Sequence, residues 1–412
     1  MKKTIRDVDV TNKRVLVRVD YNVPMDRDTI LDDTRIRASL PTIRYLVERR
    51  AKVIIITHIG RPSGFVVEEL RTDQIAARLS NLLRMPVSKV NNCIGPEVHS
   101  AVKAMEPGQV LLLENVRFHP GEVVTDMRFA ARLASFADIF VNDAFATAHR
   151  TQASTVGVAR YLPAVAGLLL ENELAGLRKV RKMIQPPVVV LLGGARLVDK
   201  ARFIDDHLER GNPILLGGLL ANSFLKAKGV DTGQSQSEIE VLGLARTLLA
   251  ENPTLLYLPT DVVVADGLSE RAKTRVVAVN RIPPAHFIVD IGPETVSRYS
   301  QMMDTARTVI WNGPMGVSEI LSFSAGTDAL ARKISGLANA AKIAGGGETI
   351  AVLDRLGLAG AVDYLSTGGA AFLDALETGT LPAIDVLENL PGEMEDEPPA
   401  AGTTPKHERQ RI

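Results

Sequence analysis

The sequence predicts an α/β protein with doubly wound parallel sheets in two halves of the chain. Short apolar segments rich in β-branched residues alternate with helical segments in both halves. The chain has 412 residues, which is too long for one ordinary core and favours two domains. Near its middle, Pro186 and Pro187 separate a long helical stretch from a new strand.

The first half alternates strands and helices in a regular order. Apolar runs bounded by turn residues predict the strands, and apolar positions at helical spacing predict the helices. The strands are expected at 13–20, 51–57, 110–113 and 138–141, and the helices at 34–50, 72–84 and 126–136. This alternation is typical of a doubly wound sheet, where ligands bind beyond the carboxyl ends of the strands.

A long helix is expected at 162–184, with its Lys and Arg residues near its C-terminal end, as the helix dipole favours. Because this helix joins the two halves, it is the natural hinge. The second half then resumes with strands at 188–192, 213–216, 287–290 and 308–311, and with helices that end near 208 and 228. Proline, charge and small polar residues predict that the end of the chain is disordered. We expect an N-terminal domain at 1–165, an interdomain helix at 166–185, a C-terminal domain at 186–390 and a disordered tail at 391–412.

Composition excludes several classes of protein. The single cysteine, Cys93, rules out a disulfide framework and fits a reducing cytosol. The sequence has neither a secretory apolar segment nor a run of about eighteen apolar residues, so we expect a cytoplasmic protein that does not contact membranes. Residues 1–183 hold 28 Lys and Arg against 20 Asp and Glu, although the whole chain is neutral. A basic half without interleaved aromatics favours a small anionic ligand over nucleic acid.

Polar residues follow each predicted strand of the first half. Because the carboxyl ends of parallel strands share one edge of the sheet, these residues predict a cationic basin there. Each residue taken alone is better explained as a solvated loop position or a helix cap, and only the whole set favours a basin. The candidates are Asp20, Asn22, His58, Arg61, Arg117 and Arg150.

Arg35 is a further candidate. It follows Asp32-Asp33-Thr34, an N-cap cluster, so it lies in the first helical turn, where a cation opposes the helix dipole by about 0.3 to 1 kcal/mol. A site that must hold an anion explains this placement, since a guanidinium binds phosphate or carboxylate in a bidentate manner. The alternative is that Arg35 pairs with the nearby aspartates.

Glycine loops follow strands in the second half. The strand at 188–192 leads into Gly193-Gly194 and a helix that carries Arg196 and Lys200. A helix N-terminus with two cations suits a nucleotide phosphate tail. An ordinary βα turn is the alternative, because the stretch contains neither a Walker loop nor a complete dinucleotide fingerprint. Further glycine loops occur at 217–218, 311–316 and 345–349. Glu348 and Thr349 at the end of the last loop are either helix caps or oxygen ligands for a nucleotide-bound Mg²⁺.

Long motifs in this chain resemble the phosphoglycerate kinase family in order and spacing over roughly residues 3–385. The motifs are RVDYNVP at 18–24, DDTRIRASLPTI at 32–43, HIGRP at 58–62, LLLENVRFHPGE at 111–122, FVNDAFATAHRTQAST at 140–155, DIGPETV at 290–296, VIWNGPMGVSE at 309–319 and GGGET at 345–349. The resemblance implies two Rossmann-like domains around a helical hinge in a monomeric glycolytic enzyme. It also implies reversible phosphoryl transfer from 1,3-bisphosphoglycerate to Mg-ADP, which gives 3-phosphoglycerate and ATP.

The same resemblance implies roles for individual residues. The acceptor is a carboxylate that is already ionised, so no general base is required. Arg35 and Arg196 are the implied catalytic residues, and Glu348 is the implied contact to the metal through the Mg-nucleotide. The implied acid-substrate site consists of Asp20, Asn22, Arg35, His58, Arg61, Arg117 and Arg150, and the implied nucleotide site consists of Gly194, Arg196, Lys200, Gly218, Asn312, Glu319, Gly346, Gly347, Glu348 and Thr349.

The second half departs from the family pattern. Arginine stands at 196 where the family usually has lysine, and glutamate stands at 348 where it usually has aspartate. The other departures are Val198, Leu219, Glu294 and Ser318. They motivate one alternative, a non-catalytic or regulatory paralogue that binds phosphoglycerate or nucleotide through an altered second half.

Overall fold

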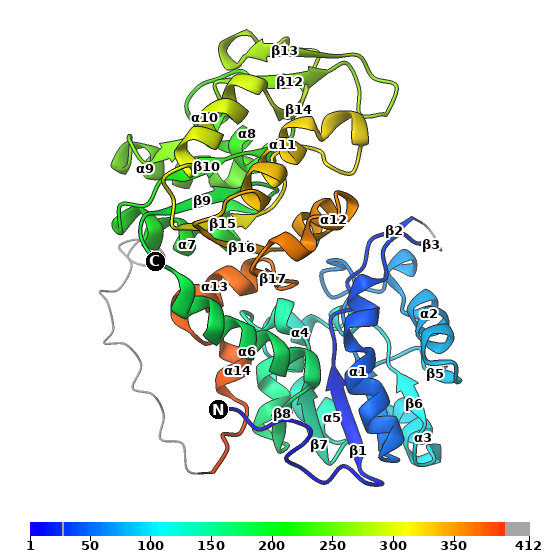
Figure 1. The fold of residues 1–412 in the computed structure, drawn as a ribbon. Helices are drawn as coiled ribbons and strands as arrows, with labels where there is room; N and C mark the ends of the chain where they lie inside the picture. Colours follow the sequence, from blue (N-terminus) through cyan, green and yellow to red (C-terminus); the bar gives the residue numbers. More distant parts are fainter. Residues whose placement is uncertain (27–28, 392–412) are drawn as a thin grey trace.

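The computed structural model describes residues 1–26 and 29–391, and it has two α/β lobes (Figure 1). The N-terminal lobe contains a six-stranded parallel sheet in the order β5-β6-β4-β1-β7-β8. This sheet confirms the α/β fold class for the first half. Its strands are β1 Arg14–Arg18, β4 Lys52–Ile56, β5 Val87–Lys89, β6 Val110–Leu112, β7 Ile139–Asn142 and β8 Ala164–Ala166.

Helices cover both faces of the N-terminal sheet, because alternate strand residues point to opposite sides. Val15 and Val17 pack with α1 and α2, whereas Leu16 packs with α3 and α5. The helices are α1 Thr34–Glu48, α2 Asp73–Leu83, α3 Pro96–Ala104, α4 Pro120–Val123 and α5 Met127–Ala134, and a short hairpin pairs β2 Met25–Asp26 with β3 Thr29–Ile30.

The C-terminal lobe contains a second six-stranded parallel sheet in the order β11-β10-β9-β15-β16-β17. Its strands are β9 Val188–Leu192, β10 Ile214–Leu216, β11 Leu256–Tyr257, β15 Thr308–Asn312, β16 Ala341–Gly345 and β17 Tyr364–Ser366. Its helices are α7 Leu197–Glu209, α8 Gly218–Ala227, α9 Leu242–Glu251, α10 Pro293–Met303, α11 Ala325–Ser335, α12 Gly347–Arg355 and α13 Ala370–Thr378.

One predicted strand lies in a different sheet from the one we expected. Residues 287–290 form part of β14 Phe287–Ile291, which pairs antiparallel with β12 Asp261–Ala265. β13 Thr274–Ala278 completes this three-stranded sheet, which lies at the far end of the C-terminal lobe (Figure 1). Sequence periodicity finds a strand but does not fix its partner, so the antiparallel pairing was not predicted.

The long helix expected at 162–184 begins later than predicted. Residues 164–166 form β8, whose backbone pairs with β7, and α6 Leu168–Met183 follows after Gly167. The short apolar run before Gly167 is compatible with either a strand or a helix, and the free edge of β7 decides between them. Helix α6 then crosses from one lobe to the other (Figure 1).

The end of the described chain returns to the N-terminal lobe. In α14 Pro382–Asp385, the Ala383 N–H donates to Ala148 O at 3.0 Å. The Glu388 N–H donates to Ala164 O at 2.9 Å, and its carboxylate pairs with Lys3 at 2.8 Å. The last residues of the range 186–390 therefore pack against the first sheet. The predicted disorder of 391–412 lies outside the described residues except for Pro391.

Candidate active site

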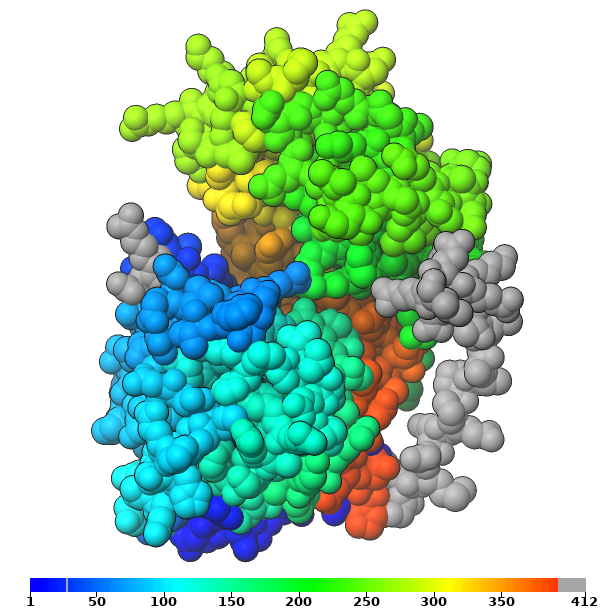
Figure 2. Space-filling model, turned by 180° about the vertical axis from the view of Figure 1, so that it is seen from behind, coloured from blue at the N-terminus to red at the C-terminus, as the bar shows by residue number. Residues whose placement is uncertain are grey.

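The two lobes border a hollow, seen from behind in Figure 2. A cavity of about 680 Å³ is lined by residues of both lobes. Its cationic lining residues are Arg61, Arg117 and Arg150 from the N-terminal lobe and Arg196 from the start of α7. We call this cavity the arginine cleft. The cleft brings together three residues predicted to bind the acid substrate and one residue, Arg196, predicted to bind the nucleotide.

The three N-terminal arginines of the cleft have no carboxylate partner among the described residues. Arg117 is nearly buried, and its Nη1 donates to Gly60 O at 2.6 Å, while its Nε has no hydrogen-bond partner. Burial, reinforced by Arg150, lowers the pKa of Arg117 to about 10. Burial and the neighbouring Arg196 likewise lower the pKa of Arg150. Positive charge that no direct ion pair neutralises is stabilised by a bound anion.

His58 lies beneath these arginines as a neutral side chain. Its Nδ1 contacts Nη2 of Arg18 at 3.2 Å, and because a guanidinium can only donate, Nδ1 accepts and the proton is on Nε2. Burial, with the charges of Arg18 and Arg117, holds the pKa of His58 well below its usual value. Sequence reasoning missed the fully buried Arg18, although an arginine inside the apolar strand RVLVR is a detectable signal.

Asp20 and Arg35 lie outside the arginine cleft. They line a separate small recess with Thr367 of the C-terminal lobe, and Arg35 Nη1 pairs with Asp20 Oδ2 at 2.5 Å. Arg35 therefore pairs with an aspartate, as the alternative interpretation predicted. Its partner is Asp20, however, and not one of the neighbouring cap residues Asp32 and Asp33. Asp33 pairs instead with Arg37 and Arg78. About a third of the Arg35 side chain stays exposed, so part of its guanidinium remains accessible.

Asn22 organises the loop that carries His58 and Arg61. Its Oδ1 accepts a hydrogen bond from Gly60 N at 2.8 Å. Its own backbone N–H donates to Asp20 Oδ1 at 3.1 Å. Asn22 thus links the loop after β1 to the loop after β4.

The glycine loops of the C-terminal lobe interlock. Gly194 N donates to Pro314 O at 2.8 Å, and Gly218 N donates to Met315 O at 2.7 Å. A Cβ on Gly193 would lie 1.9 Å from Pro314 O, so only glycine fits there. Loop packing therefore requires glycine at 193, and this reason is separate from the close ligand approach that we expected.

Glu238 occupies the start of α7, where we expected free amide groups. Its carboxylate accepts hydrogen bonds from the backbone N–H groups of Arg196 and Leu197, the latter at 2.9 Å. A side-chain carboxylate is the kind of anion that a helix N-terminus stabilises. The chain itself therefore caps this helix start, and the backbone amides of Arg196 and Leu197 are already used.

Lys200 is buried below Gly194. Its Nζ donates to Gly193 O at 2.6 Å and to Ala195 O at 3.0 Å. Burial lowers the pKa of Lys200 to about 8, and the charge of Glu348 opposes this shift most strongly. Arg196 has a left-handed backbone, with φ of 72°, and its guanidinium pairs with Asp199.

Glu348 faces Lys200 from the start of α12. Its Oε2 lies 3.5 Å from the position that a Cβ on Gly194 would take. Desolvation, together with the charge of Glu319, raises the pKa of Glu348. Lys200 and then Arg35 of the opposite lobe oppose the rise, so the Glu348 carboxyl group senses charges of both lobes.

Neither Glu348 nor Thr349 caps its helix, so the cap-only alternative is wrong for both. The N-cap of α12 is Gly346, without a side-chain cap bond, and Thr349 Oγ1 accepts a hydrogen bond from Gly313 N at 2.8 Å. Asn312 Nδ2 donates to Gly345 O at 2.8 Å, which ties the loop after β15 to the loop after β16. Gly347 and Glu319 lie exposed at the same edge of the sheet.

The fold has two α/β lobes, with a cationic cleft on one lobe and glycine loops on the other. This arrangement is typical of kinases that transfer a phosphoryl group between two anionic substrates. The family model described as phosphoglycerate kinase matches residues 5–379. The phosphoglycerate kinase of Moorella thermoacetica is 47% identical over 389 residues, which cover 94% of this chain and 99% of the relative. The phosphoglycerate kinase of Thermomicrobium roseum is also 47% identical, over 93% of this chain and 99% of the relative.

Solved structures agree with these relatives. The structure of phosphoglycerate kinase from Pyrococcus horikoshii has a TM-score of 0.78 and 34% identity, and covers 94% of this chain and 98% of its own. The structure from Coxiella burnetii has a TM-score of 0.68 and 41% identity with the same coverage. The chain belongs to the phosphoglycerate kinase family. It is a phosphotransferase with a carboxyl group as acceptor, and none of the comparisons supports the non-catalytic alternative.

Proposed function

We propose that the arginine cleft holds the acid substrate, 3-phosphoglycerate or 1,3-bisphosphoglycerate. The observation that carries this proposal is the convergence of Arg61, Arg117 and Arg150 on one cavity without carboxylate partners among the described residues. A phosphate group supplies the charge and the acceptor oxygens that three guanidinium groups need. The neutral His58 adds an Nε2–H donor, and Asp20 with Asn22 fixes the neighbouring loops.

The glycine loops of the C-terminal lobe form the proposed site for ADP or ATP. Lys200 lies buried behind Gly194, and its lowered pKa makes it responsive to a phosphate that restores the full charge. Backbone amides of loops without side chains allow close approach of a nucleotide. The other proposed contacts are Arg196, Gly218, Asn312, Glu319, Gly346, Gly347, Glu348 and Thr349.

The same loops fit a magnesium ion that arrives with the nucleotide. The carboxylate of Glu348 lies near a second carboxylate, Glu319, which raises its pKa, and a cation between such groups relieves their repulsion. The described residues contain no group of three or more metal-ligating His, Cys, Asp or Glu side chains. Mg²⁺ commonly uses one or two carboxylates together with substrate phosphates, which suits Glu348 as its protein contact. When bound, the ion neutralises phosphate charge.

Catalysis in this proposal rests on positioning and charge neutralisation. The acceptor carboxylate is ionised at neutral pH, so no residue has to remove a proton from it. Arg196 lines the arginine cleft and Arg35 lines the separate recess that includes Thr367, and we propose that the charges of both act on the transferring group. Approach of the lobes would exclude water that otherwise hydrolyses the acyl phosphate.

The proposal extends to organisation and location. We infer that residues 1–165 and 186–390 act as two domains joined by 166–185, with residues 382–390 of the second range packed against the first domain, and that the enzyme is a cytoplasmic monomer. None of the described helices has the length and apolar character that spanning a bilayer requires.

A coupled turnover assay tests the site assignment. Arg117→Ala should raise the KM for 3-phosphoglycerate by at least tenfold, the factor for losing a charge-assisted hydrogen bond of about 1.5 kcal/mol or more, and should leave the KM for Mg-ATP nearly unchanged. Arg128→Ala is the matched control, because Arg128 is an exposed arginine of α5 in the same lobe, outside the cleft lining. An equal rise in both KM values, or a rise in the control, would count against the assignment.

A further inference from the structure

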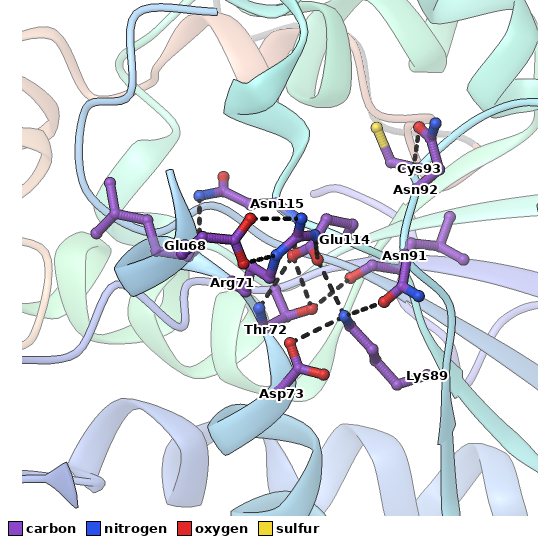
Figure 3. Close-up of polar contacts among 12 residues, drawn as sticks. Glu68, Arg71, Thr72, Asp73, Lys89, Asn91, Asn92, Cys93, Glu114 and Asn115 are labelled. Carbon is purple, nitrogen blue, oxygen red and sulfur yellow. Dashed lines mark hydrogen bonds and ion pairs between the residues drawn. The ribbon is translucent and has the colours of Figure 1, made fainter. Parts of the chain in front are cut away.

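A polar network centred on the buried carboxylate of Glu114 lies next to the loop that carries Arg117 (Figure 3). None of its members lines the cleft itself. It joins the loop after β6 to the start of α2 and to β5. The network comprises Glu68, Arg71, Thr72, Asp73, Lys89, Asn91, Glu114 and Asn115.

Asn115 connects this network to the cleft. Its Oδ1 accepts from Ile59 N at 3.2 Å and from Arg117 N at 3.1 Å. Its Nδ2 donates to Ile59 O at 2.8 Å and to Leu70 O at 3.0 Å. The side chain is fully buried, and both of its polar atoms are used twice. It thus clamps the peptide between His58 and Gly60 to the loop that carries Arg117.

Glu114 holds Asn115 in place. Its Oε1 accepts from Asn115 N at 2.9 Å and from Thr72, the N-cap residue of α2, through both N at 2.9 Å and Oγ1 at 3.1 Å. Its Oε2 accepts from Arg71 at 3.1 Å and from Lys89 at 3.0 Å. Five donors on a buried carboxylate fix its position, since leaving any of these groups without a partner is costly.

The outer members of the network contribute less to its stability than the inner members. Glu68 pairs with Arg71 at 2.6 Å but is 74% exposed, and Asp73 pairs with Lys89 at 2.9 Å and is 55% exposed. Exposed pairs of this kind contribute little. The inner pair, Glu114 and Asn115, is the part of the network that connects to the loop carrying Arg117.

We propose that Asn115 is a positioning residue for the anion site, and that Glu114 fixes it. The role follows from the bond path: Glu114 holds the Asn115 backbone, the Asn115 side chain holds Ile59, and Gly60 O next to it accepts the Arg117 guanidinium at 2.6 Å. Arg61 is the next residue along that loop. The spacing of Arg61 and Arg117 is thus set before a ligand binds, which reduces the ordering cost of binding. This inference rests on the proposed acid-substrate site.

Calorimetry on the whole protein tests the proposal, with 3-phosphoglycerate and Mg-ADP titrated separately. Asn115→Ala should raise the Kd for 3-phosphoglycerate about tenfold, as expected for one or two net hydrogen bonds, and Glu114→Gln should raise it in the same direction. The Kd for Mg-ADP should stay within about twofold, because the C-terminal lobe is untouched. Glu68→Gln is the matched control and should change neither Kd.

The outcomes separate the two proposals. A merely structural role predicts a lower melting temperature for both variants with an unchanged Kd for 3-phosphoglycerate, and that result would overturn the positioning role. If Asn115→Ala does not fold, Glu114→Gln decides by the same comparison, since glutamine preserves the shape. If Arg117→Ala weakens 3-phosphoglycerate binding while both network variants leave it unchanged, only the positioning role fails. If Arg117→Ala has no effect either, the acid-substrate site fails with it.

Discussion

Replacing Lys200 with methionine should stabilise the free protein at neutral pH while it removes nucleotide binding. Lys200 is buried, and its charge is opposed by desolvation, which lowers its pKa from 10.5 to about 8. A shift of this size corresponds to about 3 kcal/mol of cost for keeping the charge. The two hydrogen bonds to Gly193 O and Ala195 O recover about 0.5 to 1.5 kcal/mol each. Lys200→Met should therefore raise the free energy of unfolding by about 1 to 2 kcal/mol at pH 7.

The pH dependence of folding stability determines the direction in which the difference between the wild-type protein and Lys200→Met changes. Below pH 8 both the folded and the unfolded protein keep the Lys200 proton, so the full cost is present. Between about pH 8 and 10.5 the folded protein loses the proton first, so the unfolded state binds more protons and stability rises with pH. The wild-type protein should gain about 2 to 3 kcal/mol relative to Lys200→Met between pH 7 and 10.

Urea unfolding of both proteins, followed by circular dichroism at pH 7, 8, 9 and 10, measures this difference. Comparison of the two proteins removes the contributions of all other titrating groups. A stability difference that does not change with pH would refute the reasoning, because it would mean that Lys200 keeps an ordinary pKa in the folded protein.

Other perturbations have definite outcomes. Arg35→Ala should lower kcat far more than it weakens Mg-ADP binding, because the guanidinium is proposed to meet charge that develops on the transferring group; comparable losses in both would count against this. Glu348→Asp and Arg196→Lys should be non-additive in kcat/KM measured at several Mg²⁺ concentrations, since both groups are proposed to touch one phosphate tail; additive effects independent of Mg²⁺ would separate them. Deletion of residues 391–412 should leave the melting temperature and turnover nearly unchanged, and a large drop in either would show that the segment packs.

The strands and the residues that follow them were predictable, because buried parallel strands are short apolar runs and their carboxyl ends meet at one edge. Arg61, Arg117 and Arg150 were accordingly found from spacing alone and converge on one cavity. The return of residues 382–390 to the N-terminal lobe was not predictable, since it depends on long-range backbone contacts such as that of Glu388 with Ala164.

Contacts between distant loops account for most of what the sequence did not predict. Glu238 caps α7 from 41 positions away, and no local pattern marks it. Arg35 pairs with Asp20 and not with its sequence neighbours, because the carboxyl end of β1 lies close to the start of α1. Arg18 and Asn115 act through buried hydrogen bonds that exist only once the sheet has assembled.

A crystal structure of the protein with 3-phosphoglycerate and Mg-ADP tests the central claim most directly, which is that each lobe binds one substrate. We expect the phosphate of 3-phosphoglycerate within hydrogen-bond distance of Arg61, Arg117 and Arg150, and the nucleotide phosphates beside Lys200 and Glu348. A nucleotide bound among the N-terminal arginines, or an acid substrate bound outside the arginine cleft, would contradict the account.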